Sequence, residues 1–358
     1  IGYAEPKLNI KKGTFNDYDM MLFDKVIAYD HLKQKISIIV NMKTDKVMEN
    51  YVKATAQIQD LANLIRSQQT ADIPVSKSKI DFTCNVSKEE YCKLVEKTKE
   101  YIVDGDIFQA VISRQFSSPY EGSLINPYRV LRTTNPSPYM VYMKIDDEEI
   151  MSTSPETLVR LENGRLTTFP VAGSRPRGTT EEEDQELEED LLSDEKELSE
   201  HNMLVDLGRN DIGKISVFGT VEVEKYMSIE RFSHVMHIGS TVKGRIRPNL
   251  TALDAVDAVL PAGTLSGAPK LRACQIIEEL EQSKRGIYGG AIGYLDFTGN
   301  LDTCIAIRLA FQKNGKVFVR SGAGTVADSV PENEYQECIN KAAAVMDALK
   351  MAQGGDSL

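Results

Sequence analysis

Tight turns between short strand-like segments are the feature that most restricts the fold of this chain. In LVRLENGRLTTF (residues 158–169), two such segments flank Asn163-Gly164, a pair typical of a two-residue hairpin turn. Residues 291–322 continue in the same way, with short apolar runs separated by glycine-containing turns. Antiparallel strands can follow one another through such turns, whereas parallel strands need long crossover connections. We therefore predict an α+β fold with largely antiparallel sheets in preference to a doubly wound parallel sheet.

Helical segments and a linker divide the chain into three parts. Residues 1–70 combine a hairpin with a helix expected over 48–68, where apolar residues recur at helical spacing. Residues 71–86, rich in Ser and Lys, are predicted to be a linker. Residues 87–358 form the main region, and we expect the first part to pack with it as one unit.

Besides the acidic helix that contains Glu197 and Glu200, three helices are expected in the main region. The first begins at the capping box Ser87-x-x-Glu90 and ends at Gly105, a residue suited to a left-handed conformation after a helix. The other two cover LRACQIIEELEQ (271–282) and residues 331–352.

The overall charge limits the possible partners. With 42 Lys and Arg residues against 53 Asp and Glu residues, the net charge is −11, which argues against nucleic acid or an anionic membrane as the main partner. The longest apolar runs have the length of strands, too short to span a bilayer. Residues 1–20 carry charges where a signal peptide would be apolar, so a cytoplasmic protein is expected.

Cysteine and histidine are too sparse to suggest a disulfide framework or a zinc site. The five cysteines are scattered, odd in number and without a CxxC pair, and there are four histidines. Reduced thiols are expected, and any metal would be a hard cation with oxygen ligands.

Two glutamates lie where an acidic run enters an apolar helix face. Twelve of the twenty residues at 181–200 are Asp or Glu, and the apolar segment 203–207 follows. Because residues three, four and seven apart share a helix face, Glu197 and Glu200 lie on the apolar side. A buried carboxylate without a partner is costly, so this position suggests a cation or another partner.

A second pair repeats this spacing in the final helix. Glu334 and Glu337 are three residues apart, and Lys341 follows four residues after Glu337. Two such pairs that meet across a pocket could hold Mg²⁺ through carboxylates and waters. Two solvated amphipathic helices explain the spacing more simply, so both interpretations stay open on spacing alone.

Two glycine-containing segments are candidates for binding an anion. In PAGTLSGAPKLR (261–272), Ser266 or Gly267 could cap a helix whose free N–H groups point outwards. In SGAGT (321–325), two close glycines after a strand could form a nest for a carboxylate. Ordinary tight turns are the alternative for each segment.

Arg308 is a third candidate, in the strand-like segment CIAIRLA (304–310). If it faces a pocket, its guanidinium is well shaped for a bidentate contact with a carboxylate. Together with the glutamate pairs, these features suggest a small carboxylated substrate that binds with Mg²⁺.

Eight motifs in a fixed order resemble those of the chorismate-utilising enzymes. They are TSPETLVRL, FPVAGSRPRG, ELSEHNMLVDLGRND, FSHVMHIGS, LPAGTLSGAPKLRA, YGGAIGYLDF, CIAIRLA and GAGTVADSVPENEYQE. They are most similar to the large, synthase subunits of anthranilate synthases, and the resemblance covers essentially the whole chain. It implies two large, mainly antiparallel β-sheets packed as a sandwich with helices outside and chorismate between them. It also implies that residues 1–70 are the remnant of an N-terminal region and that 87–358 form the chorismate-binding catalytic region.

The resemblance implies a magnesium site made of the two glutamate pairs. Glu200 and Glu337 correspond to direct Mg²⁺ ligands, and Glu197 and Glu334 would support them through water. The cation would bind the ring carboxylate of chorismate and help the C4 hydroxyl to leave.

The resemblance also implies roles in proton transfer and substrate binding. Glu156 is expected to protonate the leaving hydroxyl as a general acid, and His237 to act in the later loss of pyruvate. For His237 taken alone, a core histidine is the alternative. Arg308, Tyr288 and the amides of Gly322 and Gly324 would hold the enolpyruvyl carboxylate. The residues expected to line the rest of the site are Gly173, Ser174 (where Thr is usual), Thr264 and Lys341.

Two positions favour one reaction within the family. Relatives that add water carry a Lys base where this chain has Gln109, which cannot take a proton from water, whereas ammonia is already a nucleophile. Aminodeoxychorismate synthases have Lys at the position of Ala172, which cannot attack the ring. The implied reaction is amination of chorismate at C2 to 2-amino-2-deoxyisochorismate, followed by pyruvate elimination to anthranilate, the first committed step of tryptophan biosynthesis. Alternatives are synthesis of 2-amino-2-deoxyisochorismate without elimination, aminodeoxychorismate synthesis, or a catalytically silent chorismate-binding or regulatory partner.

The resemblance also predicts partners. No glutaminase machinery is present, so a separate glutamine amidotransferase small subunit is expected to supply ammonia in a hetero-oligomer. The chain opens on Ile1, and we expect it to be a piece of a longer protein whose preceding segment holds an LLES-like motif. That motif forms half of a tryptophan feedback pocket in the family. The other half is expected at Asn135, Pro136, Ser137, Pro138, Tyr139 and Met140.

Overall fold

The computed structural model of the chain describes residues 15–71, 73, 76, 79–232 and 235–354. Four parts of the sequence-based predictions lie outside the described residues. These are the start of the first region (1–14), several linker positions within 71–86, Ser233 and His234 of the FSHVMHIGS motif, and the end of the main region (355–358).

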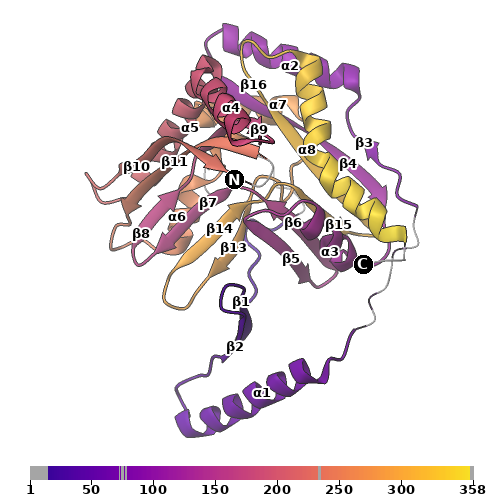
Figure 1. The fold of residues 1–358 in the computed structure, drawn as a ribbon, viewed down its shortest axis with the longest axis vertical. Coiled ribbons are helices and arrows are strands. Elements are labelled where there is room, and N and C mark those ends of the chain that lie inside the picture. Colours follow the sequence, from indigo (N-terminus) through magenta and orange to yellow (C-terminus); the bar gives the residue numbers. More distant parts are fainter. Residues whose placement is uncertain (1–14, 72, 74–75, 77–78, 233–234, 355–358) are drawn as a thin grey trace. The chain divides into compact units, whose positions relative to one another are not determined.

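Two seven-stranded sheets form the framework (Figure 1). The first has the strand order β10-β11-β8-β7-β14-β13, with β9 paired to β11. Its strands are β7 (Thr157–Glu162), β8 (Arg165–Thr168), β9 (Val171–Pro176), β10 (Glu222–Arg231), β11 (Val235–Arg245), β13 (Ala291–Leu295) and β14 (Leu301–Ile305).

The second sheet has the order β12-β4-β16-β15-β6-β5, with β3 paired to β4. Its strands are β3 (Thr83–Cys84), β4 (Gln109–Pro119), β5 (Tyr139–Ile145), β6 (Glu148–Ser154), β12 (Gly267–Ala268), β15 (Leu309–Lys313) and β16 (Lys316–Thr325). The described strand pairs of both sheets are antiparallel, as the tight turns predict.

The predicted hairpin turn at Asn163-Gly164 is confirmed. It joins β7 to β8, and its two residues have φ angles of 51° and 79°. A two-residue turn with both φ values positive matches the right-handed twist of the flanking strands, which is why Asn-Gly is favoured there.

The two sheets pack against each other. Ile150 on β6, Ile292 on β13 and Phe311 on β15 belong to one buried apolar cluster, so both sheets contribute to it. Polar contacts join the sheets as well. The hydroxyl of Tyr139 on β5 donates to Asp302 Oδ1 on β14 at 2.8 Å. The predicted sandwich of two antiparallel sheets is therefore confirmed.

Helices pack on the sheets (Figure 1): α8 on β16, α7 on β4, α5 on β11 and α6 on β7. The helices of this part are α2 (Lys88–Val103), α3 (Ile125–Thr134), α4 (Glu181–Ser193), α5 (Glu195–Gly213), α6 (Ala252–Val259), α7 (Lys270–Leu280) and α8 (Pro331–Met351), with 3-10 turns η2 (Gly263–Leu265) and η3 (Ala352–Gly354). Burying one Leu or Ile side chain of these interfaces contributes about 1.5–3 kcal/mol. In the described part of the chain, no helix is both long and apolar enough to cross a bilayer.

The first helix of the main region begins and ends as predicted. Ser87 Oγ accepts from the Glu90 amide at 3.2 Å, and the Glu90 carboxylate accepts from the Ser87 amide at 2.9 Å. Gly105 follows the helix with a φ of 81°. The capping box therefore places α2 correctly from sequence alone.

By its internal contacts the chain separates into two units, Asn16–Pro74 and the rest. The smaller unit contains the antiparallel hairpin of β1 (Lys25–Asp30) and β2 (Lys35–Val40) and the helix α1 (Val47–Ser67), all three as predicted. The predicted boundaries at 70 and 86 lie near this division without matching it. The expected packing of residues 1–70 with the catalytic region stays a prediction.

Candidate active site

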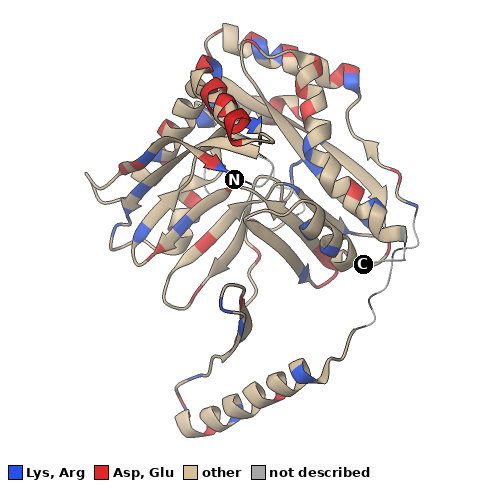
Figure 2. Cartoon of the chain, viewed as in Figure 1, with Lys and Arg blue, Asp and Glu red and all other residues tan. Residues whose placement is uncertain are grey.

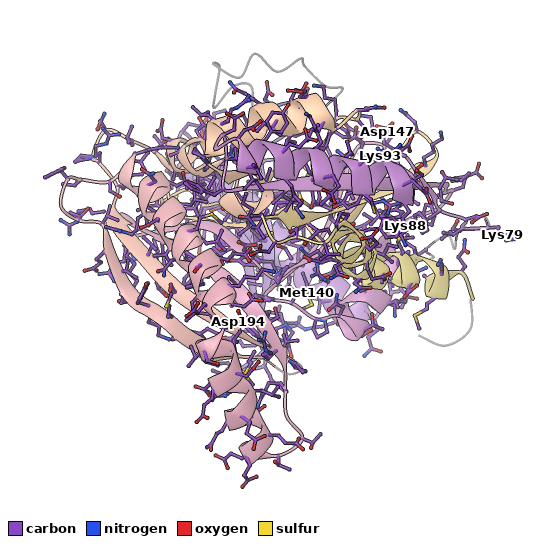
Figure 3. The ribbon with its side chains drawn as sticks, turned by 90° about the horizontal axis from the view of Figure 1, so that it is seen from above. Lys79, Lys88, Lys93, Met140, Asp147 and Asp194 are labelled. Carbon is purple, nitrogen blue, oxygen red and sulfur yellow. The ribbon has the colours of Figure 1, made fainter. Side chains whose placement is uncertain are left out.

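The acidic stretch is divided at Asp194, where α4 ends and α5 begins (Figure 3). In Figure 2 most of the α4 ribbon has the colour of Asp and Glu. Asp194 starts the new helix, because its Oδ1 accepts from the amides of Lys196 and Glu197 at 3.1 and 3.2 Å. Glu197 and Glu200 therefore belong to a separate helix from most of the acidic run.

Glu197 and Glu200 enter the protein as the helical spacing predicts. Both are half-buried, while Leu204, one turn further on, is buried. Burial raises the pKa of the Glu197 carboxyl, and the negative charges of Glu200 and Asp194 add to the effect. The apolar side of α5 thus carries carboxylates that are destabilised as anions when no cation is bound.

The two glutamates on α8 differ in burial. Compared with the half-buried pair on α5, Glu334 is more deeply buried and Glu337 is more exposed. Glu334 is 8% exposed, and its Oε2 has no hydrogen-bond partner among the described atoms. Burial raises the pKa of Glu334, as does the nearby Glu337. Glu337 is exposed to solvent over about half of its side chain and forms an ion pair of 2.5 Å with Lys341.

Contacts through the second sheet bring the two pairs into one region. Gln109 on β4 donates from Nε2 to Glu200 Oε1 at 3.1 Å. Gly324 on the neighbouring strand lies so close to that amide that a Cβ there would come within 2.5 Å of Nε2. On the same strand, the carbonyl of Gly322 accepts from Lys341 Nζ at 3.2 Å. A chain of contacts therefore runs from the α5 pair to the α8 pair.

The two glutamate pairs supply carboxylate ligands of the kind that Mg²⁺ binds. Within the described residues, no three His, Cys, Asp or Glu side chains gather into a ready metal-binding group. Mg²⁺ nevertheless commonly uses one or two carboxylates and completes its shell with water and substrate oxygens. The unpartnered, buried oxygen of Glu334 and the raised pKa values of Glu334 and Glu197 are what such carboxylates show without a cation. The chemistry of the donors fits Mg²⁺, and the site itself stays a prediction.

Glu156 lies between β6 and β7 with the properties of a proton donor. Burial raises the pKa of its carboxyl to about 7, although the bond from Thr264 and the charge of Lys341 act in the opposite direction. Thr264 Oγ1 donates to Glu156 Oε1 at 3.0 Å. A carboxyl with a pKa near 7 can both hold and release a proton at neutral pH. The structure thus places two of the predicted catalytic residues in direct contact.

His237 is fixed through one ring nitrogen. Its Nδ1 lies 2.7 Å from the carbonyl oxygen of Gly173 and 3.0 Å from Ser174 Oγ. Because a carbonyl can only accept, Nδ1 carries the proton and Nε2 of the neutral ring is left as an acceptor. Gly173 has a φ of 65° and lies against α5, where a Cβ would come within 3.2 Å of Glu197 Oε2. The segment 173–174 therefore joins the histidine to the α5 pair.

Arg308 and Tyr288 form another corner of the site. Burial lowers the pKa of the Arg308 guanidinium, while Tyr288 and Glu337 act to raise it, so both lie within electrostatic reach. Tyr288 is buried, and burial raises the pKa of its hydroxyl. The expectation that Arg308 lies within a strand is wrong: it occupies the connection between β14 and β15 with a φ of 48°.

Two expectations about anion-binding loops are also wrong. Pro269, not Ser266 or Gly267, is the residue that caps α7, because Gly267 is drawn into β12 and pairs with Ala110. The glycines of 321–325 do not form a nest after a strand, since β16 continues to Thr325 and pairs with β4.

The amides of that strand nevertheless retain one open edge. β15 accompanies β16 only from Lys316 to Val319, so no described strand pairs with the second edge of residues 320–325. That edge is compatible with the predicted contact between the Gly322 and Gly324 amides and a carboxylate.

The segment expected to form half of a tryptophan pocket spans the end of α3 and the start of β5. Tyr139 donates to Asp302 and contacts Thr157 Oγ1 at 2.8 Å, and the Ser137 hydroxyl donates to the Ser154 carbonyl. Met140 is 44% exposed on β5 (Figure 3). The binding of tryptophan at Asn135–Met140 stays a prediction.

Sequence reasoning missed a buried set of charges at the end of α7. Glu281, Arg285 and Arg320 form ion pairs there, and the side chains of Glu281 and Arg320 are almost completely buried. In the sequence, EQSKRG (281–286) has the composition of a solvated turn, so no local signal marks these charges as internal.

Comparisons with known proteins identify the family and agree with the fold. The family model described as "chorismate binding enzyme" matches residues 3–347. The chain is 54% identical to an anthranilate synthase component 1 from Acetivibrio thermocellus over 93% of the chain and 69% of that protein. It is 48% identical to the component 1 from Aquifex aeolicus over 99% of the chain and 73% of that protein. The crystal structure of anthranilate synthase component I from Streptococcus pneumoniae superposes with a TM-score of 0.80 at 44% identity, covering 90% of this chain and 72% of the other.

The family model and the relatives match nearly the whole chain. The chain belongs to the chorismate binding enzymes and, within them, to the anthranilate synthase component 1 group of lyases.

Proposed function

We propose that this enzyme aminates chorismate at C2 with ammonia and then eliminates pyruvate to give anthranilate. The observation that carries the proposal is the contact of Gln109 with Glu200, which puts a neutral amide beside the acidic pair. An amide cannot activate water as a base, whereas ammonia as the free base needs no activation. Mg²⁺ held by Glu200 and Glu337, with Glu197 and Glu334 through water, would neutralise the ring carboxylate of chorismate.

In the first step, ammonia forms a bond to C2 while the C4 oxygen leaves with its bonding electrons. Glu156 protonates that oxygen, so the leaving group is water. The new ammonium group loses one proton, and the product is 2-amino-2-deoxyisochorismate. The proposed role suits a carboxyl whose pKa of about 7 keeps part of it protonated at neutral pH. Thr264 fixes the other side of the same carboxyl.

In the second step, a base removes the C2 proton and the enolpyruvyl group leaves, which makes the ring aromatic. Nε2 of His237 is the acceptor, since Nδ1 is engaged by the Gly173 carbonyl. The enolate of pyruvate takes up a proton, so anthranilate and pyruvate are formed in equal amounts. Arg308, Tyr288 and the amides of Gly322 and Gly324 would hold the carboxylate of the leaving group.

The wider setting follows from the same proposal. A glutamine amidotransferase small subunit would supply ammonia in a hetero-oligomer, in keeping with the "component 1" in the relatives' names. Tryptophan would bind at Asn135–Met140 in the intact protein and inhibit the enzyme. The described residues contain no disulfide, which favours the cytoplasm.

The test is turnover of the purified chain with chorismate, Mg²⁺ and ammonium at mildly alkaline pH, measured by anthranilate fluorescence and pyruvate release. Equal amounts of both products are expected. Accumulation of 2-amino-2-deoxyisochorismate without pyruvate would show that the enzyme stops after amination. Formation of the isomer aminated at C4 would assign it to aminodeoxychorismate synthesis.

A further inference from the structure

A buried network of charges joins the segments that carry the site, although its members are not expected to touch chorismate. At its centre is Glu281, whose side chain is 4% exposed. Arg285 donates to both of its oxygens, from Nε at 2.9 Å and from Nη2 at 2.6 Å. The guanidinium of Arg320 lies 3.8 Å from the same carboxylate. Buried ion pairs are costly to desolvate and are often replaceable by apolar residues, so stability alone is a weak reason for this one.

The carboxylate of Glu281 holds two strands of the second sheet in register. It accepts from the amide and the hydroxyl of Ser113 on β4 at 2.7 and 2.8 Å. β4 also carries Gln109, and Arg320 precedes Gly322 by two residues on β16. Burial raises the pKa of Glu281, but Arg285 and Arg320 outweigh this and keep the pKa below its usual range. The carboxylate therefore remains an anion that binds both strands.

Arg285 extends the network to three further points of the site. Its Nη1 donates to the carbonyl of Leu265, next to Thr264, at 2.6 Å. Its Nη2 donates to the carbonyl of Val111, two residues from Gln109, also at 2.6 Å. The same guanidinium lies 5.9 Å from the centre of the Tyr288 ring.

The geometry of these contacts requires an arginine. A guanidinium presents its donors in a rigid, planar fork. The positions of Glu281, Leu265 and Val111 relative to one another are therefore fixed by the directions of these donors. A lysine would keep the positive charge beside Glu281 but could not make these bonds at once.

We propose that Glu281 and Arg285 are positioning residues that set the distances between Thr264, Gln109 and Tyr288 around bound chorismate. This inference rests on the proposed function, because it assigns those three residues to one substrate. It predicts that loss of the fork weakens chorismate binding and slows turnover while the fold persists.

The test compares Arg285→Lys with Arg272→Lys. Arg272, on α7, pairs with the half-exposed Asp106 and donates also to Gln275, away from the site. Arg285→Lys should raise the KM for chorismate about tenfold and lower kcat by a similar factor, with Tm within a few degrees of the parent. Arg272→Lys should change none of these. If Arg285 only neutralised the charge of Glu281, a lysine would serve equally well. A folded Arg285→Lys protein with the parental KM and kcat would therefore overturn the proposal.

A second variant keeps the test decisive if Arg285→Lys does not fold. Glu281→Gln removes the charge but keeps an acceptor for Ser113, and it should raise the KM for chorismate about tenfold. A folded Glu281→Gln with the parental KM contradicts the proposal as well. Failure of the proposed function looks different, because then the parent itself gives neither anthranilate nor calorimetrically detectable binding of chorismate, and the inference falls with it.

Discussion

The glutamate pair on α5 and the pair on α8 share one spacing, yet their members have different partners. Glu200 accepts from the neutral amide of Gln109, while Glu337 is paired with the cation of Lys341. A divalent cation that binds Glu200 keeps the Gln109 contact, but one that binds Glu337 competes with the lysine. The α5 pair therefore has more uncompensated negative charge, and the α8 pair is the one whose contacts have to rearrange.

The largest expected effect tests whether the two pairs hold the same ion. Glu200→Gln and Glu337→Gln should each lower Mg²⁺-dependent turnover by at least about 100-fold, because each removes a proposed direct ligand. The fold should persist in Glu200→Gln, since glutamine can still accept from Gln109. The measurement is anthranilate formation against Mg²⁺ concentration, with circular dichroism as the check on folding.

Glu186→Gln on α4 is the matched control, because that residue belongs to the solvated acidic run and no role in the site is assigned to it. It should leave the Mg²⁺ dependence unchanged. If Glu337→Gln retained parental activity while Glu200→Gln lost it, the ion would belong to the α5 pair alone and the proposed shared site would be wrong.

A smaller effect should distinguish Glu334 from Glu197 in the metal-free protein, through the dependence of the free energy of unfolding on pH. Glu334 has a raised pKa in the folded state, so the folded state binds its proton more tightly than the unfolded state does. The free energy of unfolding therefore falls as pH rises from the ordinary value of 4.5 through the raised one. Glu334→Gln removes this loss and should therefore stabilise the metal-free chain at pH 8.

This stabilisation should vanish in two conditions. At pH values below 4 the parent's Glu334 is protonated in both states, so the two proteins should have similar Tm values. In Mg²⁺, ligand binding should raise the Tm of the parent more than that of Glu334→Gln. Glu197→Gln, at a half-buried position, should change the stability in the same direction under each condition, but by a smaller amount. A lower Tm for Glu334→Gln in chelator at pH 8 would contradict this account.

The difference between the two pairs also shows what sequence can and cannot predict. Helical spacing correctly predicted inward positions for Glu197, Glu200 and Glu334, because that property depends only on residues of one helix, whereas Glu337 is exposed. Their partners Gln109 and Lys341 differ in how far they lie along the chain from the glutamate that they contact. Lys341 is a neighbour on the same helix turn and was visible in the spacing, whereas Gln109 comes from a strand ninety-one positions away.

The errors in the sequence-based fold have one physical source. Gly267 and the glycines of 321–325 were expected in turns on local propensity, but pairing with β4 places them in strands. The positive φ of Arg308 likewise results from the change of sheet between β14 and β15, not from a local signal. Turn residues and caps that act within a few positions, such as Asn163-Gly164 and Ser87, were predicted correctly because no distant partner competes with them.

The smallest expected effect asks whether the α8 pair reaches the proton donor. Lys341, whose charge lowers the pKa of Glu156, also forms the ion pair with Glu337, and Thr264 lowers the same pKa through its hydrogen bond. Since Glu156 acts in its protonated form, activity should fall as pH rises through a pKa of about 7. Thr264→Val and Lys341→Met should each raise that pKa and move the alkaline limb of kcat to higher pH.

The measurement needs ammonia at a constant concentration of its free base, so that the titration of ammonium does not shape the profile. It also needs saturating Mg²⁺, because Lys341→Met alters the surroundings of Glu337. Lys350→Met, further along α8 and paired with Asp347, is the control and should leave the limb in place. If Thr264→Val moves the limb and Lys341→Met does not, the charge of Lys341 acts on Glu337 alone and the α8 side does not influence the proton donor. If both variants move it, the α8 side influences cation binding and proton donation together.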